Sequence, residues 1–383
     1  METIGAINRS VEILLRICGL WTGSPYAPFC KLYWTFSFSI TIILSFQYII
    51  KYLQDTDLPE LMETFSVFVV NILVFCKLVI FWLNQRTLDE LLAIMAMDWK
   101  KNIDTDLNAH IMAKKANLSR YFSNTLVVIY SGSVLAYSIV ILATNIFSNE
   151  SSERSLLIKM NLPFDSNRQF VHEFVMLNQL FQLLMLASAD AILNALLITM
   201  VLHASGQIKI LCGWLIKIFP KKEKYNLQIT MVEKIITRHQ DIIAFSKKIE
   251  KLYSYIALVQ FLSDTLLICG LGFILATSIG KPNTWVILIK TCLFYFSMNL
   301  EAFTFCFAGE YLSTESKIIG DAAYNSLWYE STSKDTQIIL FLIMRSQNQL
   351  TITIGKITDM SLKRFSDIVK ASASYISVLL AMY

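Results

Sequence analysis

Six apolar stretches, each long enough to cross a lipid bilayer, constrain this chain more than any other feature of its sequence. They cover residues 32–50, 62–83, 122–147, 174–202, 256–279 and 285–307, and a spanning helix needs roughly 20 such residues. Hydrophobic residues make up 55% of the 383 positions and charged residues only 16%, against roughly 25% charged residues in a typical soluble protein. The sequence therefore predicts an all-α integral membrane protein.

A seventh element, at the C-terminal end, is less uniform. Residues 336–354 are apolar around "IILFLIM" but contain Arg345, and a second apolar run follows at 362–383. Gly355 and Ser361 separate the two runs, and such residues commonly interrupt helices. We expect one split element, whose first half does not face lipid and whose second half spans the membrane.

Lys and Arg residues are unevenly distributed among the connections and predict the orientation. They gather before the first span, between spans two and three, and between spans four and five, and they are sparse in the alternate connections. Because Lys and Arg favour cytoplasmic loops, we expect the N-terminus inside and, after seven spans, the C-terminus outside. Asn149, in the sequon Asn149-Glu150-Ser151, then lies outside and is a candidate for glycosylation.

The connection after the fourth span predicts a cytoplasmic extension of the bundle. Between residues 225 and 255 apolar side chains recur at helical spacing, which is typical of a helix that packs against others. We expect a single domain with a transmembrane part at about 32–202 and 256–383 and a cytoplasmic anchor at about 203–255 and 308–361. Residues 4–18 have a similar pattern and predict an amphipathic helix, either at the membrane interface or packed in the cytosol.

The sequence lacks the common motifs of enzymes, metal sites and nucleic-acid-binding proteins. The four His residues show no ligand spacing, and no Cys-x-x-Cys pair, Gly-rich phosphate loop or Gly-x-Ser-x-Gly turn occurs. Basic residues do not cluster with stacking aromatic residues, as they would on a nucleic-acid-binding surface. We therefore expect no catalysis, no cofactor or metal, and no nucleic-acid partner.

Four ionisable residues inside the apolar stretches are functional candidates, because charges within a membrane are costly. Lys77 and Lys290 lie within about two turns of a predicted interface, and we expect their long side chains to reach it. Asp264 and Glu301 either face a wet cavity or bond to neighbouring helices. A structural role is the favoured interpretation for both.

The final stretch, "SDIVKASASYISVLLAMY", carries small and polar residues along one side of a helix drawn at 100° per residue. Lys370, Ser374, Ser377, Val378 and Ala381 share this side, with larger apolar residues opposite. The helix alone is consistent with close packing against another helix and with one wall of a water-filled pore that has an apolar gate. The pore requires an oligomer with this helix near its axis.

Several short motifs follow one another in the C-terminal third of the chain. They are "FTFCFAGEYLSTESKIIGDAAYNSLWYE" with Tyr324, Trp328 and Tyr329, "MRSQ" with Arg345, "TITIGKI" with Gly355 and Lys356, and "LKRFSDIVKASASYISVLL" with Tyr375. Over about the last 150 residues the chain thereby resembles the insect odorant receptors. In that family a Pro commonly follows the Arg-Ser-Gln turn, and Gln349 stands there instead, so the geometry of this turn differs from the family pattern.

The resemblance implies a ligand-gated, non-selective cation channel subunit that forms a heterotetramer with an odorant co-receptor subunit. It implies a small volatile odorant as ligand and the plasma membrane of sensory neuron dendrites as location. It also implies that the cytoplasmic ends of helices four to six, with the first half of helix seven, form an intersubunit anchor. The second half of helix seven would line the pore, with Val378 at the constriction and Lys370, Ser374, Ser377, Ala381 and Met382 on the same wall.

Two related receptor types match less well. Gustatory receptors end in a Thr-Tyr-(x)5-Gln-Phe pattern, and here Ala381 and Met382 replace the Gln-Phe pair. The co-receptor has a long insertion between helices four and five, whereas this connection is short. The resemblance therefore implies a ligand-tuning subunit. The alternatives are a gustatory-type receptor channel and a seven-helix chemoreceptor that signals through G proteins, which the charge distribution disfavours.

The resemblance further implies an apolar ligand pocket in the outer half of the transmembrane helices, as suits small volatile molecules. In a membrane bundle an aromatic residue at helical spacing is a packing residue more often than a ligand contact. For each candidate, packing within the bundle is therefore the alternative to ligand contact. The candidates are Phe65, Phe68, Ile72, Ser133, Tyr137, Ile141, Leu177, Phe181, Leu184 and Tyr295.

Overall fold

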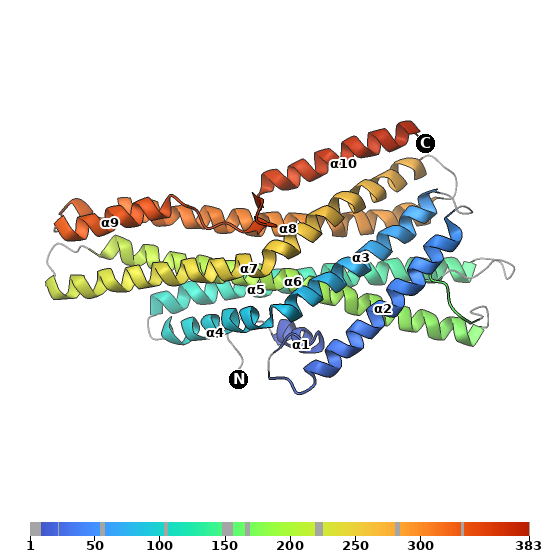
Figure 1. Cartoon of the computed structure of the whole chain (residues 1–383), viewed down its shortest axis with the longest axis horizontal. Helices are drawn as coiled ribbons and strands as arrows, with labels where there is room; N and C mark the ends of the chain where they lie inside the picture. Colours follow the sequence, from blue (N-terminus) through green and yellow to red (C-terminus); the bar gives the residue numbers. More distant parts are fainter. Residues whose placement is uncertain are drawn as a thin grey trace.

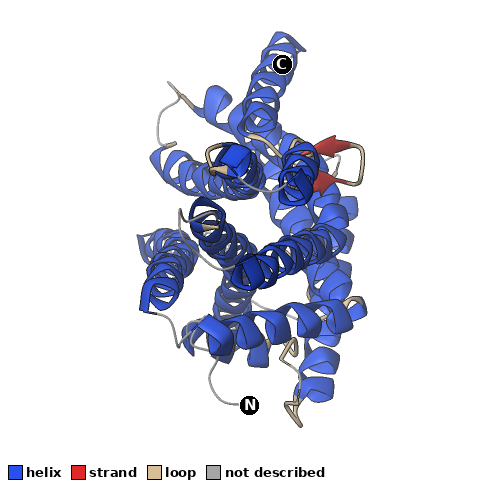
Figure 2. Ribbon diagram, turned by 90° about the vertical axis from the view of Figure 1, so that its left-hand side faces the viewer, coloured by secondary structure: helices blue, strands red, loops and turns tan. Residues whose placement is uncertain are grey.

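The computed structural model describes residues 9–21, 23–53, 58–102, 106–147, 156–164, 169–218, 225–279, 284–330 and 333–382, and most of them are helical (Figures 1 and 2). The elements in chain order are α1 (Arg9–Ile17), α2 (Ala27–Tyr52), α3 (Leu58–Leu83), α4 (Gln85–Asn102), α5 (Asp106–Phe147), α6 (Gln169–Lys217), α7 (Tyr225–Ser278), α8 (Trp285–Tyr324), η1 (Trp328–Glu330), α9 (Ser333–Ser346), β1 (Thr353–Ile354), β2 (Thr358–Asp359) and α10 (Leu362–Met382).

Six of these helices, α2, α3, α5, α6, α7 and α8, are long and apolar enough to cross a membrane. Each covers one of the six apolar stretches of the sequence to within one residue, and the prediction of an all-α membrane protein is confirmed. Helices α5 to α8 extend well beyond those stretches, because hydropathy marks only the apolar part of a helix. Helix α5, for example, begins at Asp106 and runs through the polar segment "KKANLSR" into its apolar part.

The long helices connect two halves of the molecule, which lie along the horizontal axis of Figure 1. Helices α2, α3 and α10 belong to the right-hand half, α4 and α9 belong to the left-hand half, and α5 to α8 run through both. Helix α6 is central and packs against α1, α5, α7 and α8. Helix α10 lies on α7 and α8 at the edge of the bundle, so one of its sides has no neighbour among the described residues.

The N-terminal helix α1 packs within the chain. Val11 and Leu15 on its apolar face are buried, and the helix contacts α2 and α6. An indole group holds its C-terminal end, because Nε1 of Trp34 donates to the carbonyl oxygen of Ile17 at 2.9 Å. The apolar pattern of the N-terminal segment therefore serves contacts with other helices.

A buried charge cluster holds α4 against α6 and α7 in the left-hand half. Asp98 of α4 accepts a hydrogen bond from Arg238 of α7 at 2.5 Å and lies 3.2 Å from Nε2 of His203 of α6. Burial by itself raises the pKa of Asp98, but the His203 hydrogen bond and the Arg238 charge outweigh it, so this pKa lies below its ordinary value. The ionised carboxylate thus connects three helices.

The last third of the chain is split as the sequence predicts. Helix α8 is followed by η1 and α9, and the antiparallel pair β1–β2 then precedes α10. The turn between the strands places Gly355 and Lys356 in the left-handed region, with φ of 57° and 62°, which glycine adopts without steric strain. Their backbone N–H groups donate to O and Oγ of Ser254 at 2.9 and 3.0 Å, so this turn is fixed on α7.

Candidate ligand-binding cavity

A cavity of about 130 Å³ lies between α3, α5, α6 and α8. Its wall is mainly apolar, and an apolar cavity of about 150 Å³ in another protein stays dry and binds benzene. The space therefore suits a small, largely apolar molecule. The lining residues are Val67, Val70, Asn71, Leu73 and Val74 of α3, Tyr130, Ser133, Val134 and Tyr137 of α5, Leu183, Leu186, Ala187 and Asp190 of α6, and Lys290, Leu293, Phe294, Ser297, Met298 and Glu301 of α8.

The four helices contribute to the cavity in the same way, through residues three and four positions apart. On α3, for example, Val67, Val70, Asn71 and Val74 line the wall. Residues at this spacing share one helix face, whereas a shift of one position turns a side chain by about 100°. One face of each helix therefore builds the cavity, and its other faces meet neighbouring helices or the surface.

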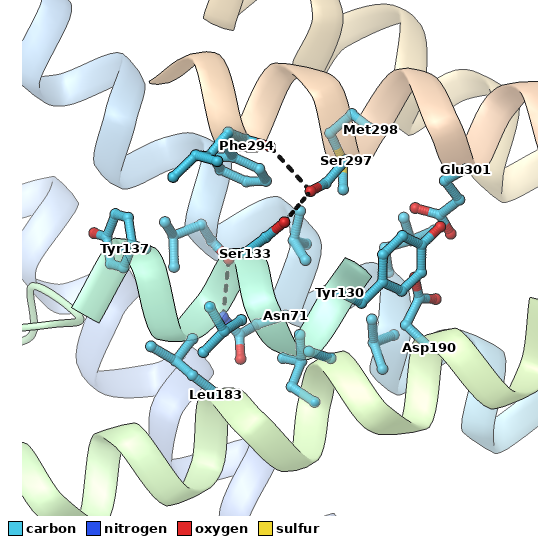
Figure 3. Close-up of a pocket in the computed structure, with 18 of the residues that line it drawn as sticks. Asn71, Tyr130, Ser133, Tyr137, Leu183, Asp190, Phe294, Ser297, Met298 and Glu301 are labelled. Atoms are coloured by element: carbon cyan, nitrogen blue, oxygen red, sulfur yellow. Dashed lines mark hydrogen bonds between the residues drawn. The ribbon is translucent and has the colours of Figure 1, made fainter. Parts of the chain in front are cut away.

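Besides Tyr130 and Tyr137, three neutral polar side chains interrupt the apolar wall (Figure 3). Oγ of Ser297 lies 3.3 Å from Oγ of Ser133, which joins α8 to α5 across the cavity. Asn71 of α3 is buried, and its Nδ2 donates to the carbonyl oxygen of Val67 at 2.9 Å. A ligand in this cavity would meet polar groups from three helices.

Charged side chains close one end of the cavity, which we call its deeper end. Lys77 of α3 pairs with Asp190 of α6, with Nζ 2.6 Å from Oδ1, and also with Glu301 of α8. The Lys77 side chain is only 1% exposed, so the expectation that it reaches the membrane surface is wrong. Two carboxylates from neighbouring helices hold its ammonium group inside the bundle, as a buried charge requires.

Glu301 bonds to a neighbouring helix, which is one of the two positions that the sequence allowed for it, and it also lines the mainly apolar cavity. Asp264 of α7 is buried, accepts a hydrogen bond from Gln260 at 2.7 Å, and interacts electrostatically with Glu301 and Lys77. One cation and three acidic side chains therefore lie together in the centre of the bundle.

An ion pair stands at the opposite end of the cavity. Nζ of Lys290 on α8 lies 2.7 Å from Oε1 of Glu63 on α3, and it lies over the ring of Tyr137. A second cavity of about 120 Å³ begins here and shares Val67, Tyr137 and Lys290 with the first. The hydroxyl of Tyr137 donates to the carbonyl oxygen of Leu157 at 3.2 Å. The ion pair and Tyr137 thus lie between two adjoining cavities.

The ligand contacts expected from the sequence are only partly gathered at these cavities. Ser133 and Tyr137 line the first cavity, and Ile141 lines the second. The remaining candidates occupy other faces of the same helices: Phe65, Phe68 and Ile72 on α3, Leu177, Phe181 and Leu184 on α6, and Tyr295 on α8.

Four wall residues with polar groups, Asn71, Tyr130, Asp190 and Ser297, are not among the residues singled out from the sequence. Asp190 carries the same signal as Asp264 and Glu301, an ionisable residue inside an apolar stretch, and could have been found by it. Asn71 and Ser297 are neutral polar residues within the apolar stretches of α3 and α8. Their sequence context does not reveal which way they point.

One face of helix α10 is not covered by any of the residues that the structure describes. Ile368 and Ser372 are buried, and Ile376 packs against Gly272 of α7. The opposite face is exposed along its length and carries Lys370, Ser374, Ser377, Val378 and Ala381. Met382 ends α10, and its side chain lies outside the described part of the structure.

The motif residues of the C-terminal third lie between α8 and α10. Nε1 of Trp328 donates to the carbonyl oxygen of Tyr324 at 3.1 Å, and its ring meets that of Tyr329 edge-on. Arg345, in the last turn of α9, donates to the carbonyl oxygen of Asn348 at 3.5 Å. Gly355 and Lys356 form the turn fixed on α7. Two further positions are Tyr375, exposed on α10, and Asn149, which lies outside the described residues.

The chain matches the family model of the 7tm odorant receptors over residues 57–373. It is 30% identical to odorant receptor 10 of Aedes albopictus over 161 residues, which are 42% of each chain. It is 28% identical to odorant receptor 22c of Drosophila melanogaster over 160 residues, which are 41% of this chain and 38% of that one. The matched region thus covers less than half the length of each of these curated relatives.

The fold is similar to that of the insect olfactory receptor OR5 from Machilis hrabei. The structure of that receptor in complex with eugenol matches this chain with a TM-score of 0.82, and the match covers 97% of both chains at 16% sequence identity. A second structure of the same receptor has a TM-score of 0.78 at 17% identity. At such identities the likeness describes the arrangement of the helices.

Proposed function

The chain belongs to the 7tm odorant receptor family, and from this we propose that it is an odorant receptor, a subunit of a ligand-gated, non-selective cation channel. Its ligand is a small volatile molecule that enters the cavity between α3, α5, α6 and α8. The observation that carries the proposal is this cavity, which four membrane-length helices enclose with mainly apolar side chains. The family is one of receptors and not of enzymes.

We place the left-hand half of Figure 1 in the cytoplasm and the cavity towards the outside. The excess of Lys and Arg in the connections on the left-hand side supports this orientation. The membrane spans then lie within about 32–202 and 256–383, and the cytoplasmic anchor comprises about 203–255 and 308–361, within one domain. Helix α10 is the seventh span and ends outside.

Helix α10 lines the pore in this proposal. The support is its free face, where Lys370, Ser374 and Ser377 lead to Val378 and Ala381 while Ile368 and Ile376 pack inward. One such helix cannot enclose a channel, so several subunits surround the axis. We propose a heterotetramer with an odorant co-receptor, in the plasma membrane of sensory neuron dendrites, in which this chain is the ligand-tuning subunit.

Helix α8 connects the cavity with the pore. It lines the cavity through Ser297, Met298 and Glu301, and two residues further on Phe303 meets Phe365 of α10 edge-on at 5.7 Å. A ligand shifts the pore towards opening only as far as it binds the open arrangement more tightly. We propose that a bound odorant favours a wider spacing of the helices around the cavity, which moves α10 away from the axis and widens the ring at Val378.

Electrical recording tests this function. Cells that express the chain together with an insect odorant co-receptor should give cation currents in response to members of a panel of volatile ligands. The control is the co-receptor alone, and surface expression of both chains is measured in parallel. A complete panel without any current, despite normal surface expression of both subunits, would contradict the proposal.

An epitope after Tyr383 separates the channel from a receptor that signals through G proteins. The proposed topology predicts that antibodies label this epitope in intact cells. Labelling that requires permeabilised cells would place the C-terminus inside and contradict the channel topology. An epitope before Met1 provides the reverse control, because it should be accessible only after permeabilisation.

A further inference from the structure

The polar atoms on the wall of the cavity are mostly hydrogen-bond acceptors, and most of the hydrogens beside them are already donated within the protein. We propose that the cavity selects small apolar molecules that carry a hydrogen-bond donor, above all a hydroxyl group, over ethers of the same size. This inference rests on the proposed role of the cavity as the odorant site and specifies the chemical class of its ligand.

Asn71 provides the central observation. Its side chain is buried at 2% exposure, and its Oδ1 has no hydrogen-bond partner among the described residues. The orientation of the amide is fixed, because Nδ2 donates to the carbonyl oxygen of Val67 and a carbonyl can only accept. A buried acceptor without a donor carries an energetic cost. Since Asn71 lines the cavity, a ligand with an O–H group can supply the missing donor.

The two serines of the wall add acceptor capacity of the same kind. Oγ of Ser133 donates to the carbonyl oxygen of Ile129 at 2.9 Å. Oγ of Ser297 has two acceptors within reach, the carbonyl oxygen of Leu293 at 3.0 Å and Oγ of Ser133 at 3.3 Å. A hydroxyl has one hydrogen and two lone pairs. The single hydrogen of each serine is therefore engaged within the protein, and its oxygen is left to accept.

Two donors at the wall already have partners. The hydroxyl of Tyr137 donates to the carbonyl oxygen of Leu157, and the ammonium group of Lys290, which has three hydrogens, pairs with Glu63. The hydroxyl of Tyr130 accepts a hydrogen bond from Nδ2 of Asn194 at 3.3 Å and keeps its own hydrogen to donate. Carboxylates at the deeper end of the cavity add further acceptors (Figure 3). An ether oxygen can only accept, so an ether would leave Oδ1 of Asn71 without a partner. An alcohol of equal size would donate to it.

Two pairs of isomers isolate this single difference. They are 1-octanol with 1-methoxyheptane and 2-phenylethanol with benzyl methyl ether, and each pair has the same atoms. Binding to the purified full chain is measured by the concentration dependence of the ligand-induced shift in Tm, which needs no channel activity. We expect each alcohol to bind about tenfold more tightly than its ether, because one buried hydrogen bond distinguishes them.

Asn71→Leu removes the acceptor and nearly keeps the side-chain volume, and it should reduce the alcohol-to-ether ratio to about one or two. Asn299→Leu is the matched control. Asn299 on α8 makes the same type of bond, from Nδ2 to the carbonyl oxygen four residues earlier at 2.8 Å, but it does not line the cavity. Its substitution should leave the ratio unchanged. Ser297→Ala, a smaller change, should lower the ratio as well and serves if Asn71→Leu fails to fold.

The inference is overturned if the ethers bind as well as the alcohols, if no alcohol of the two pairs binds, or if both cavity variants keep the ratio of the unmodified chain. Recordings with the co-receptor separate this inference from the proposed function. Tight, Asn71-dependent binding of alcohols without any current would uphold the ligand class and contradict the channel. Equal currents from alcohol and ether would uphold the channel and overturn the ligand class.

Discussion

Replacing Lys77 by methionine tests the buried charge cluster that closes the deeper end of the cavity. Lys77 is the cation shared by Asp190 and Glu301, and its side chain is 1% exposed. The Lys77→Met variant keeps much of the side-chain volume but leaves two buried carboxylates facing each other, with Asp264 close by. Such carboxylates are far more costly than the loss of an exposed ion pair, because no water replaces the missing cation.

The expected loss of stability follows from this burial. Removing one partner of a buried ion pair costs about 3–5 kcal/mol. For a chain of this length we take about 1–2 °C of Tm per kcal/mol, which gives a decrease of roughly 3–10 °C. The double variant Lys77→Met/Glu301→Gln should recover at least about 1 kcal/mol, because it removes one of the unpaired charges.

The assay is the Tm of the full chain purified in detergent, followed by the loss of the monodisperse fraction on heating. Lys159→Met is the matched control. Lys159 also pairs with an acidic residue, Glu60, but the two side chains are 28% and 48% exposed, and exposed pairs contribute about 0–1 kcal/mol. If Lys77→Met lowers the Tm no more than Lys159→Met does, the assignment of a buried, structural ion cluster is refuted.

Three further predictions concern other parts of the chain. Gly309→Ala should destabilise by about 1–3 kcal/mol, because a Cβ at Gly309 would lie 2.5 Å from the carbonyl oxygen of Met360. Gly213→Ala should stabilise by about 0.5–1 kcal/mol, because its Cβ would meet no described atom within 4 Å apart from its own helix backbone and chain neighbours. Equal Tm changes in the two variants would contradict the close contact at Gly309. The pKa of Asp98 lies below its ordinary value of 3.8, so the ionised carboxylate stabilises the fold fully above pH 3.8 and this stabilisation is lost as the pH falls through the lowered pKa. The contribution of Asp98 to Tm should therefore be constant from pH 8 to pH 5. The variant Asp98→Asn should be less stable at pH 7 and should lose less stability than the unmodified chain on acidification below pH 4. Val378→Ala should widen the proposed constriction and raise the relative permeability to large organic cations, and unchanged permeation and gating would place the narrowest point elsewhere.

Much of the helical framework could be predicted from the sequence. Apolar stretches of bilayer length identify six helices, and Gly355 marks the break in the last element because its turn requires a positive φ. The apolar stripe of α7 was also evident, and Ile235, Ile242 and Ile249 are indeed buried. These features depend on local patterns, which a single sequence records directly.

The identity of the cavity face could not be predicted in the same way. Lipid and an apolar cavity select the same side chains, so Phe65 and Leu177, both exposed on the single chain, look no different in sequence from Val70 and Leu186, which line the cavity. Soluble proteins reveal their buried faces by a contrast between apolar and polar residues, and membrane helices lack this contrast. The position of Lys77 was also predicted wrongly. Its partner Asp190 is 113 positions away in the chain, and a local sequence pattern does not reveal such a contact.

The central claim is that a ligand in the cavity between α3, α5, α6 and α8 opens the pore, and filling the cavity tests it most directly. Ala187 lines the cavity, and its neighbour Ser188 on α6 does not, so Ala187→Leu and Ser188→Leu form a matched pair. Each variant is expressed with an insect odorant co-receptor, and the half-maximal odorant concentration for current is measured at equal surface expression. Ala187→Leu should raise this concentration by about tenfold or more, a factor that corresponds to 1.4 kcal/mol of lost binding, and Ser188→Leu should leave it nearly unchanged. An unchanged response in Ala187→Leu, or the same change in both variants, would contradict the account.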